Sequence, residues 1–174
     1  MTTLPLAEWH DFYVMIGTAS GVIVGATFIV ATLAAGLESK SLGMRGFITP
    51  TAVHLGSVLI GSAILTVPTL GLVGLSVLLG AGGLAGAVYG VVVSTRIWHM
   101  NLDRDDRAFY TLFPVLAYAA MAVAAVTARW TPENALEILA VSLVALLIIG
   151  MRNAWDMTSF MITREKRDTP PDSQ

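Results

Sequence analysis

The sequence predicts an all-α membrane protein, a bundle of five transmembrane helices, and composition and charge placement are the observations behind that prediction. Apolar residues make up 55% of the 174 residues and charged residues 13%, whereas soluble domains carry about 25% charged residues. The mean hydropathy is +0.73. A soluble chain of this size could not bury so many apolar side chains, because small domains keep much of their surface in water.

Charged residues are gathered between long apolar stretches, and those stretches define the spans. Residues 12–37 carry no charge, which is enough for a bilayer span of about 20 residues. Residues 47–95 have His54 and Tyr89 as their only titratable groups. As one helix they would be about 74 Å long, so the chain has to turn, and Pro68 with Gly71 marks the turn. The predicted spans are residues 12–36, 50–68, 71–94, 109–128 and 132–158, all in one domain over residues 1–162.

Two helix starts carry a threonine followed by a proline. Thr49-Pro50 is typical of an N-cap followed by a proline at the first helical position, where the missing N–H costs nothing, so the second span is predicted to begin at Pro50. Thr131-Pro132 repeats the pattern before the fifth span, with Glu133 near the positive end of the helix dipole. Residues 163–174 are mostly polar with two prolines, which predicts a short disordered tail.

The lysines and arginines predict the orientation of the bundle. Basic residues accumulate on the cytoplasmic side of a membrane protein. With five spans and the N-terminus outside, every one of the ten basic residues except Arg129 falls on the cytoplasmic side. The prediction is therefore an external N-terminus and a cytoplasmic C-terminus.

Glycines recur every four residues in two of the predicted spans. They are Gly17, Gly21 and Gly25 in the first span and Gly82, Gly86 and Gly90 in the third. A spacing of four places residues on one helix face, where the missing side chains let another backbone approach closely. This glycine-zipper pattern is compatible with packing inside one bundle, with packing between identical subunits, or with a ligand or pore face.

His54 is the most informative titratable residue within a span. A helix start at Pro50 puts it about 6 Å from the cytoplasmic end of the helix. There it could bind a ligand or act in gating, or it could bond to Thr51 or a neighbouring carbonyl. His99 is predicted at the same membrane face, so a haem shared by the two histidines is a further hypothesis; His10 lies on the opposite side. No ligand pattern flanks these histidines, and neither a metal nor a cofactor is expected.

Arg152 and Asp156 are four residues apart near the cytoplasmic end of the fifth span. Their spacing predicts an i,i+4 ion pair on one helix face. The alternative is that they dock a partner protein. Neither has to lie at the bilayer midplane, where a proton relay or a coupled transporter would place an ionisable residue.

The function predicted from these features is non-enzymatic. No nucleophile elbow, phosphate-binding glycine loop, metalloprotease motif or dinucleotide fingerprint occurs, so no catalytic residue is predicted. A net charge of −2 argues against nucleic acid as a partner. We expect helix–helix association in the lipid bilayer, by self-assembly or as a subunit of a larger membrane complex. The alternatives are a small homo-oligomeric channel or transporter, with Ser57 and Ser62 among its pore hydroxyls, and a haem- or quinone-binding subunit.

The beginning of the first span carries one resemblance. Trp9 and Phe12, followed by Gly17 and Gly25, resemble the start of small bacterial multi-pass membrane proteins of uncharacterised function. Those proteins likewise begin with a W-x-x-F pattern and a glycine-spaced first helix. The resemblance is confined to this segment; it implies a bacterial inner membrane and supplies no catalytic residue.

Overall fold

The computed structural model describes residues 6–37, 42–97 and 108–168, and all regular structure in these ranges is helical. The helices are α1 (Leu6–Leu37), α2 (Leu42–Leu65), α3 (Leu72–Ile97), α5 (Phe113–Thr127) and α6 (Pro132–Asp168), with a π-helical turn, η1 (Ala108–Leu112), directly before α5. Four segments are long and apolar enough to cross a membrane: Leu6–Thr32, Leu72–Arg96, Ala108–Thr127 and Pro132–Asp156. The apolar part of α2, Thr49–Leu65, is shorter. The chain is thus an all-helical multi-pass membrane protein.

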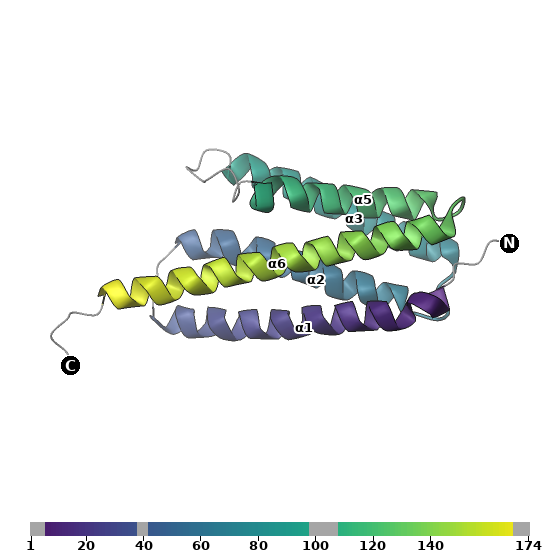
Figure 1. Ribbon diagram of the computed structural model, residues 1–174. Helices are drawn as coiled ribbons and strands as arrows, with labels where there is room; N and C mark the ends of the chain where they lie inside the picture. The colour runs from purple at the N-terminus through teal and green to yellow at the C-terminus, as the bar shows by residue number, and fades with distance from the viewer. Residues whose placement is uncertain (1–5, 38–41, 98–107, 169–174) are drawn as a thin grey trace.

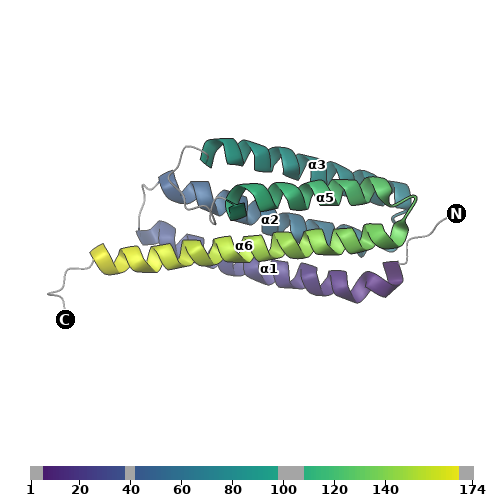
Figure 2. The same cartoon turned by 45° about the horizontal axis from the view of Figure 1, so that its top comes forward.

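The helices form two antiparallel pairs joined by α6 (Figures 1 and 2). One pair is α1 with α2, and the other is α3 with α5. α6 lies across both pairs and contacts α1, α2 and α5. α1 begins at one end of the bundle and α6 ends at the other (Figure 1). This arrangement makes α6 the element that holds the two pairs together.

The two ends of the bundle differ, and we name them by their residues. The turn end holds the connection at residues 66–71 between α2 and α3 and the connection at residues 128–131 between α5 and α6. The basic end holds the last turn of α3, with Arg96, and the part of α6 that carries Arg152. The turn predicted at Pro68 and Gly71 is confirmed, because α2 ends at Leu65 and α3 begins at Leu72.

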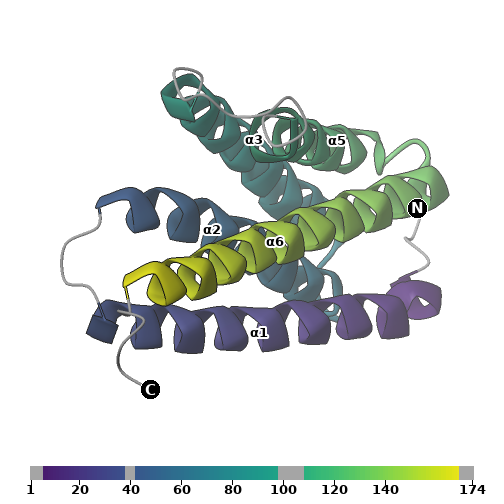
Figure 3. The ribbon, with the colours of Figure 1, turned by 60° about the vertical axis from the view of Figure 1, so that its left-hand side comes forward.

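The seam between the two pairs is loose along one side. α2 and α3 follow each other in the chain but make far less contact than either helix makes within its own pair. They meet beside the turn that joins them and diverge toward the basic end (Figures 1 and 3). Side chains rather than close helix contact therefore have to bridge this seam.

The core changes character along the bundle. Toward the turn end it is mainly aliphatic, with Tyr13 and Ser62 as buried polar residues and the following leucines buried together: Leu65, Leu75, Leu79, Leu136 and Leu139. Toward the basic end, where α2 begins, α5 begins and α6 leaves the bundle, polar side chains are buried as well: Thr51, His54, Thr111 and Asn153. This polar half of the core is where a functional site is to be sought, because buried polar groups cost free energy unless they are paired.

The prediction that α2 begins at Pro50 is wrong. The helix begins at Leu42 and continues through Pro50, which lies inside it. A proline removes one backbone hydrogen bond, yet membrane helices tolerate it where neighbouring helices and hydroxyl side chains satisfy the freed groups. Pro50 is itself buried and is flanked by Thr49 and Thr51. His54 consequently lies about 18 Å from the helix start rather than about 6 Å, in the interior of the bundle.

The π-helical turn before α5 was not predicted. Pro114, in the first turn of α5, lacks the N–H that would bond to the carbonyl of Tyr110 four residues earlier. The wider π turn at Ala108–Leu112 lies directly before this proline and contains Tyr110. Turns of this kind interrupt α-helices at few places and are frequent at functional sites.

The other helix ends agree with the predictions to within two turns, except the end of α6, which lies almost three turns beyond the predicted residue 158. α1 begins at Leu6, ahead of the predicted residue 12, and α3 ends at Ile97 rather than at residue 94. α6 begins at Pro132 as predicted, with the Ala135 N–H bonded to the Thr131 carbonyl at 3.0 Å. α6 continues to Asp168, so residues 163–168 are helical where the sequence predicts an irregular tail.

Candidate functional site

A chain of hydrogen bonds joins α2 to α5 in the polar half of the core. The Nδ1 atom of His54 lies 3.1 Å from the Tyr118 hydroxyl. That hydroxyl donates to Ser57 Oγ at 2.9 Å, and Ser57 donates to the Val53 carbonyl at 2.8 Å. His54 is 2% exposed and Tyr118 is fully buried. We call His54, Ser57 and Tyr118 the polar cluster; it bridges the seam between the two helix pairs.

The direction of these bonds fixes the tautomer of His54. A backbone carbonyl can only accept, so the Ser57 proton is donated to Val53 and Ser57 Oγ accepts from Tyr118. With its own proton given to Ser57, the Tyr118 oxygen accepts, and the His54 Nδ1 atom has to carry the donating hydrogen. Because a buried charge is costly, we take the imidazole as neutral, and its Nε2 atom is then unprotonated. The cluster therefore offers neutral hydrogen-bonding groups rather than charges.

Asn153 of α6 adds an unexplained polar group at the same level of the bundle. It is 1% exposed, and among the described residues neither its amide nitrogen nor its amide oxygen has a hydrogen-bond partner. A β-carbon placed on Gly150 would lie 2.6 Å from Leu55 Cδ2, which shows how closely α6 approaches α2. Because the two helices are antiparallel, Asn153, almost one turn beyond Gly150, lies at a level between those of Thr51 and His54. An unpaired buried amide costs about 1–3 kcal/mol, so apolar packing does not account for this residue.

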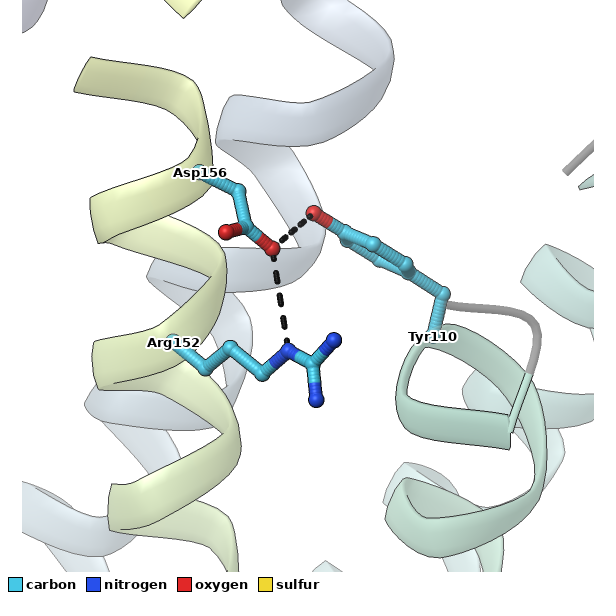
Figure 4. A network of polar contacts seen from close by, with 3 residues as sticks. All are labelled: Tyr110, Arg152 and Asp156. Atoms are coloured by element: carbon cyan, nitrogen blue, oxygen red, sulfur yellow. Dashed lines mark hydrogen bonds and ion pairs between the residues drawn. The ribbon is translucent and has the colours of Figure 1, made fainter. Parts of the chain in front are cut away.

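Arg152 and Asp156 form the predicted ion pair and also contact η1 (Figure 4). The Arg152 Nε atom lies 3.8 Å from Asp156 Oδ2, and both side chains are more than a third exposed. The Tyr110 hydroxyl donates to the same carboxylate at 3.4 Å, a long hydrogen bond. The Arg152 guanidinium lies 3.9 Å from the centre of the Phe109 ring. Both residues thus attach α6 to the start of α5, and their docking of a partner remains a prediction.

The glycines of α3 pack against α5. A β-carbon on Gly86 would overlap the ring of Tyr118, and one on Gly90 would lie 2.8 Å from Val115 Cγ2. Gly83 makes the closest approach of two backbones, because a β-carbon there would lie 2.7 Å from the backbone nitrogen of Ala122. Gly82, in contrast, is exposed, and its nearest neighbour would be Met121 Cε at 3.6 Å. The face of α3 that packs on α5 therefore includes Gly83 in place of Gly82.

The glycines of α1 pack progressively less. A β-carbon on Gly17 would lie 2.9 Å from Ser62 Cβ of α2, and one on Gly21 would lie 3.8 Å from Leu59 Cδ1. Gly25 is exposed and has nothing within 4 Å. This face begins inside the bundle and runs out onto its surface.

Two surface grooves of similar size lie on the bundle. The first, about 370 Å³, separates α2 from α3 and is lined at one end by Ser57 of the polar cluster and by Tyr89. The second, about 390 Å³, separates α5 from α6, and Ser142 is the only polar side chain that lines it. The Ser142 hydroxyl is already bonded to the Ile138 carbonyl at 2.7 Å.

The remaining histidines do not join His54 in the described structure. His10 is exposed near the start of α1, at the turn end. His99 lies outside the described residues, so the haem hypothesis stays a prediction. Within residues 6–37, 42–97 and 108–168, no group of three or more His, Asp or Glu side chains could hold a metal ion.

Sequence reasoning missed the hydrogen-bond partner of His54, Tyr118, and the buried amide of Asn153. Each is a large polar side chain within an apolar span, which is the signal that could have found them. Both residues are neutral, so the pattern of charged residues did not mark them.

Comparison of the chain with protein-family models, with curated proteins and with solved structures finds no match.

Proposed function

We propose that this chain is a non-enzymatic inner-membrane protein of a bacterial cell that acts by helix–helix association, with a second copy of itself as its partner. In this proposal all five helices cross the bilayer, the N-terminus is outside and the C-terminus is cytoplasmic. The observation that supports it is the open part of the glycine face on α1, where Gly25 is exposed with nothing within 4 Å.

α1 lies at the edge of the bundle, so most of its surface faces the lipid. In its apolar segment 22% of the residues are buried, against 50% for α6. The outward face carries Thr18, Val22, Gly25 and Ile29, all of them exposed. Their spacings of four, three and four follow one helix face, as in the seam of a coiled coil. Gly25 makes a notch between Val22 and Ile29 into which a bulky side chain of another helix fits.

In a bilayer, such a notch favours the association of two helices. Lipid tails are as apolar as leucine, so membrane helices associate through close van der Waals packing, and small residues permit it. Two copies related by a twofold axis present the same surface to each other. Gly25 of one copy can therefore receive the Val22 or Ile29 side chain of the other.

The test is the mass of the purified protein in mild detergent, measured by light scattering with correction for bound detergent. We expect a discrete multiple of 18.4 kDa for the natural sequence and a monomer for Gly25→Leu. Leu84→Ala, on the outward face of α3, is the control and should keep the larger mass. A monomeric natural protein, or a Gly25→Leu variant of unchanged mass, would overturn the proposal.

A further inference from the structure

The groove between α2 and α3 is long, narrow and polar at one end only. It follows residues 53–64 of α2 and 78–89 of α3, which is about 17 Å along each helix. The helices are antiparallel, so Ser57 and Tyr89 line the end toward the basic end of the bundle, and Ile64 and Leu78 line the other. Met121 of α5 also lines it.

The two hydroxyls at the polar end have complementary capacities. Ser57 has donated its proton to the Val53 carbonyl, so it can only accept a further hydrogen bond. The Tyr89 hydroxyl forms no hydrogen bond with any described residue and is able to donate. A ligand group that donates to Ser57 and accepts from Tyr89 satisfies both, and a hydroxyl does this. An ionised carboxylate would accept from Tyr89 and would be attracted by Arg96, whose charge acts on the Tyr89 hydroxyl, but it has no proton to donate to Ser57.

The groove between α5 and α6 is the reference for non-specific filling by bilayer lipid, because it resembles the first groove in size but no free hydroxyl donor lines it. Its volume is about 390 Å³, against about 370 Å³ for the groove between α2 and α3. Its walls are apolar apart from Ser142, whose hydroxyl donates to the Ile138 carbonyl of its own helix. Hydrocarbon chains of the bilayer fit both grooves equally. Only the groove between α2 and α3 also offers hydrogen-bonding groups at one end.

We propose that the groove between α2 and α3 binds a single-chain lipid with a hydroxyl head group. The head group bonds to Tyr89 and Ser57, and the hydrocarbon chain runs along Ile60 and Ile64 toward the turn end. The elongated shape fits an alkyl chain, and the volume lies within the roughly 300–1,000 Å³ typical of ligand sites. The groove is lined by α2, α3 and α5 and by no residue of α1, the helix that carries Gly25, so the site is independent of self-association.

The test is photolabelling of the full-length protein with a diazirine-bearing hexadecanol, followed by peptide mapping. We expect label in the groove between α2 and α3, displaced by unlabelled hexadecanol, at least fivefold above label in the groove between α5 and α6. The matching diazirine-bearing hexadecanoic acid should label the first groove at least fivefold less. Equal labelling of both grooves would mean that bulk lipid alone fills them, and equal labelling by acid and alcohol would contradict the hydroxyl head group; either overturns the proposal.

Two variants with matched controls make the assignment specific. Tyr89→Phe removes the donating hydroxyl and should reduce groove labelling at least fivefold, whereas Ser142→Ala should not. Ala85→Phe places a ring in the groove from an exposed position and should abolish labelling. Val141→Phe does the same in the other groove and should leave it intact. Each variant is first shown to unfold at the same denaturant concentration as the natural protein. Full labelling of folded Ala85→Phe would refute the site.

Discussion

The two glycine-bearing helices, α1 and α3, share one sequence pattern but pack differently. In α3, Gly83 and Gly86 lie against α5 so closely that no side chain fits. In α1, contact is lost along the helix: Gly17 lies against Ser62, whereas Gly25 faces outward. The face is closed in α3, where Gly83 takes the place of Gly82, and it opens along α1, where the glycines keep the strict spacing of four.

The difference arises because four residues are not one helical turn. Each residue turns the chain by about 100°, so a step of four passes a full turn by about 40°. Gly25 is therefore rotated by about 80° from Gly17 around α1. The buried residues of α1 follow a heptad instead, with Tyr13, Ser20 and Thr27 all buried.

In α3 the packed glycines avoid this drift. Gly83, Gly86 and Gly90 are spaced by three and then four, which follows the helical period, and all three are buried. Gly82 belongs to the strict spacing of four and is exposed. Close contact between helices is therefore indicated by alternating spacings of three and four, and a strict spacing of four leads off the packed face.

The largest expected effect is the contrast between Gly83→Ala and Gly25→Ala. The first puts a methyl against the backbone of Ala122 and should lower the free energy of unfolding by about 3 kcal/mol. The second adds a methyl in open space and should raise it by about 0.5–1 kcal/mol, because alanine favours the helix. Unfolding by SDS titration in mixed micelles measures both, and equal effects would remove the distinction between the two faces.

An intermediate effect is expected for Tyr118→Phe. The ring of Tyr118 packs against Gly86 on the glycine face of α3. Without its hydroxyl the buried His54 N–H and Ser57 Oγ lose their common partner, at a cost of about 1–3 kcal/mol. A double-mutant cycle with Ser57→Ala should show coupling, since the two residues share a bond. The control is Tyr13→Phe, whose hydrogen bond to the Leu136 carbonyl is separate from the cluster and whose effect should add to that of Ser57→Ala. Additive effects of Tyr118→Phe and Ser57→Ala on the free energy of unfolding would contradict the cluster.

The smallest effect is expected for Gly17→Ala, the packed end of the α1 face. The new methyl would lie 2.9 Å from Ser62 Cβ, so a small shift of α1 from α2 should cost about 1 kcal/mol. Ser62→Gly removes the opposing carbon and should restore most of that loss in the same titration. A Ser62→Gly change that fails to restore stability to Gly17→Ala would place the strain elsewhere.

What could be predicted from the sequence is local. The turn at Pro68 and Gly71 and the helix start at Pro132 follow from a few adjacent residues, and both are confirmed. The start of α2 was wrong although its signal was equally local, because Pro50 is compatible both with a first helical turn and with the interior of a membrane helix. Only its packing among the other helices distinguishes the two.

Two residues of the candidate site were named from the sequence, His54 as a ligand or gating residue and Ser57 as a pore hydroxyl, but nothing brought them together. The depth assigned to His54 depended on the wrong helix start. Its partner Tyr118 is 64 residues away in the chain, and nothing in the sequence pairs the two. The glycine that makes room for the Tyr118 ring, Gly86, was found for its spacing, yet the spacing did not indicate what it would face.

The sequence by itself determined that this is an all-helical membrane protein and roughly where its helices turn, because hydrophobicity over about 20 residues and proline–glycine turns are properties of neighbouring residues. Only the tertiary structure decided which face of each helix packs, which polar groups meet in the core and which grooves stay open. Those outcomes depend on the angles between helices, and the angles result from all the side chains between them at once.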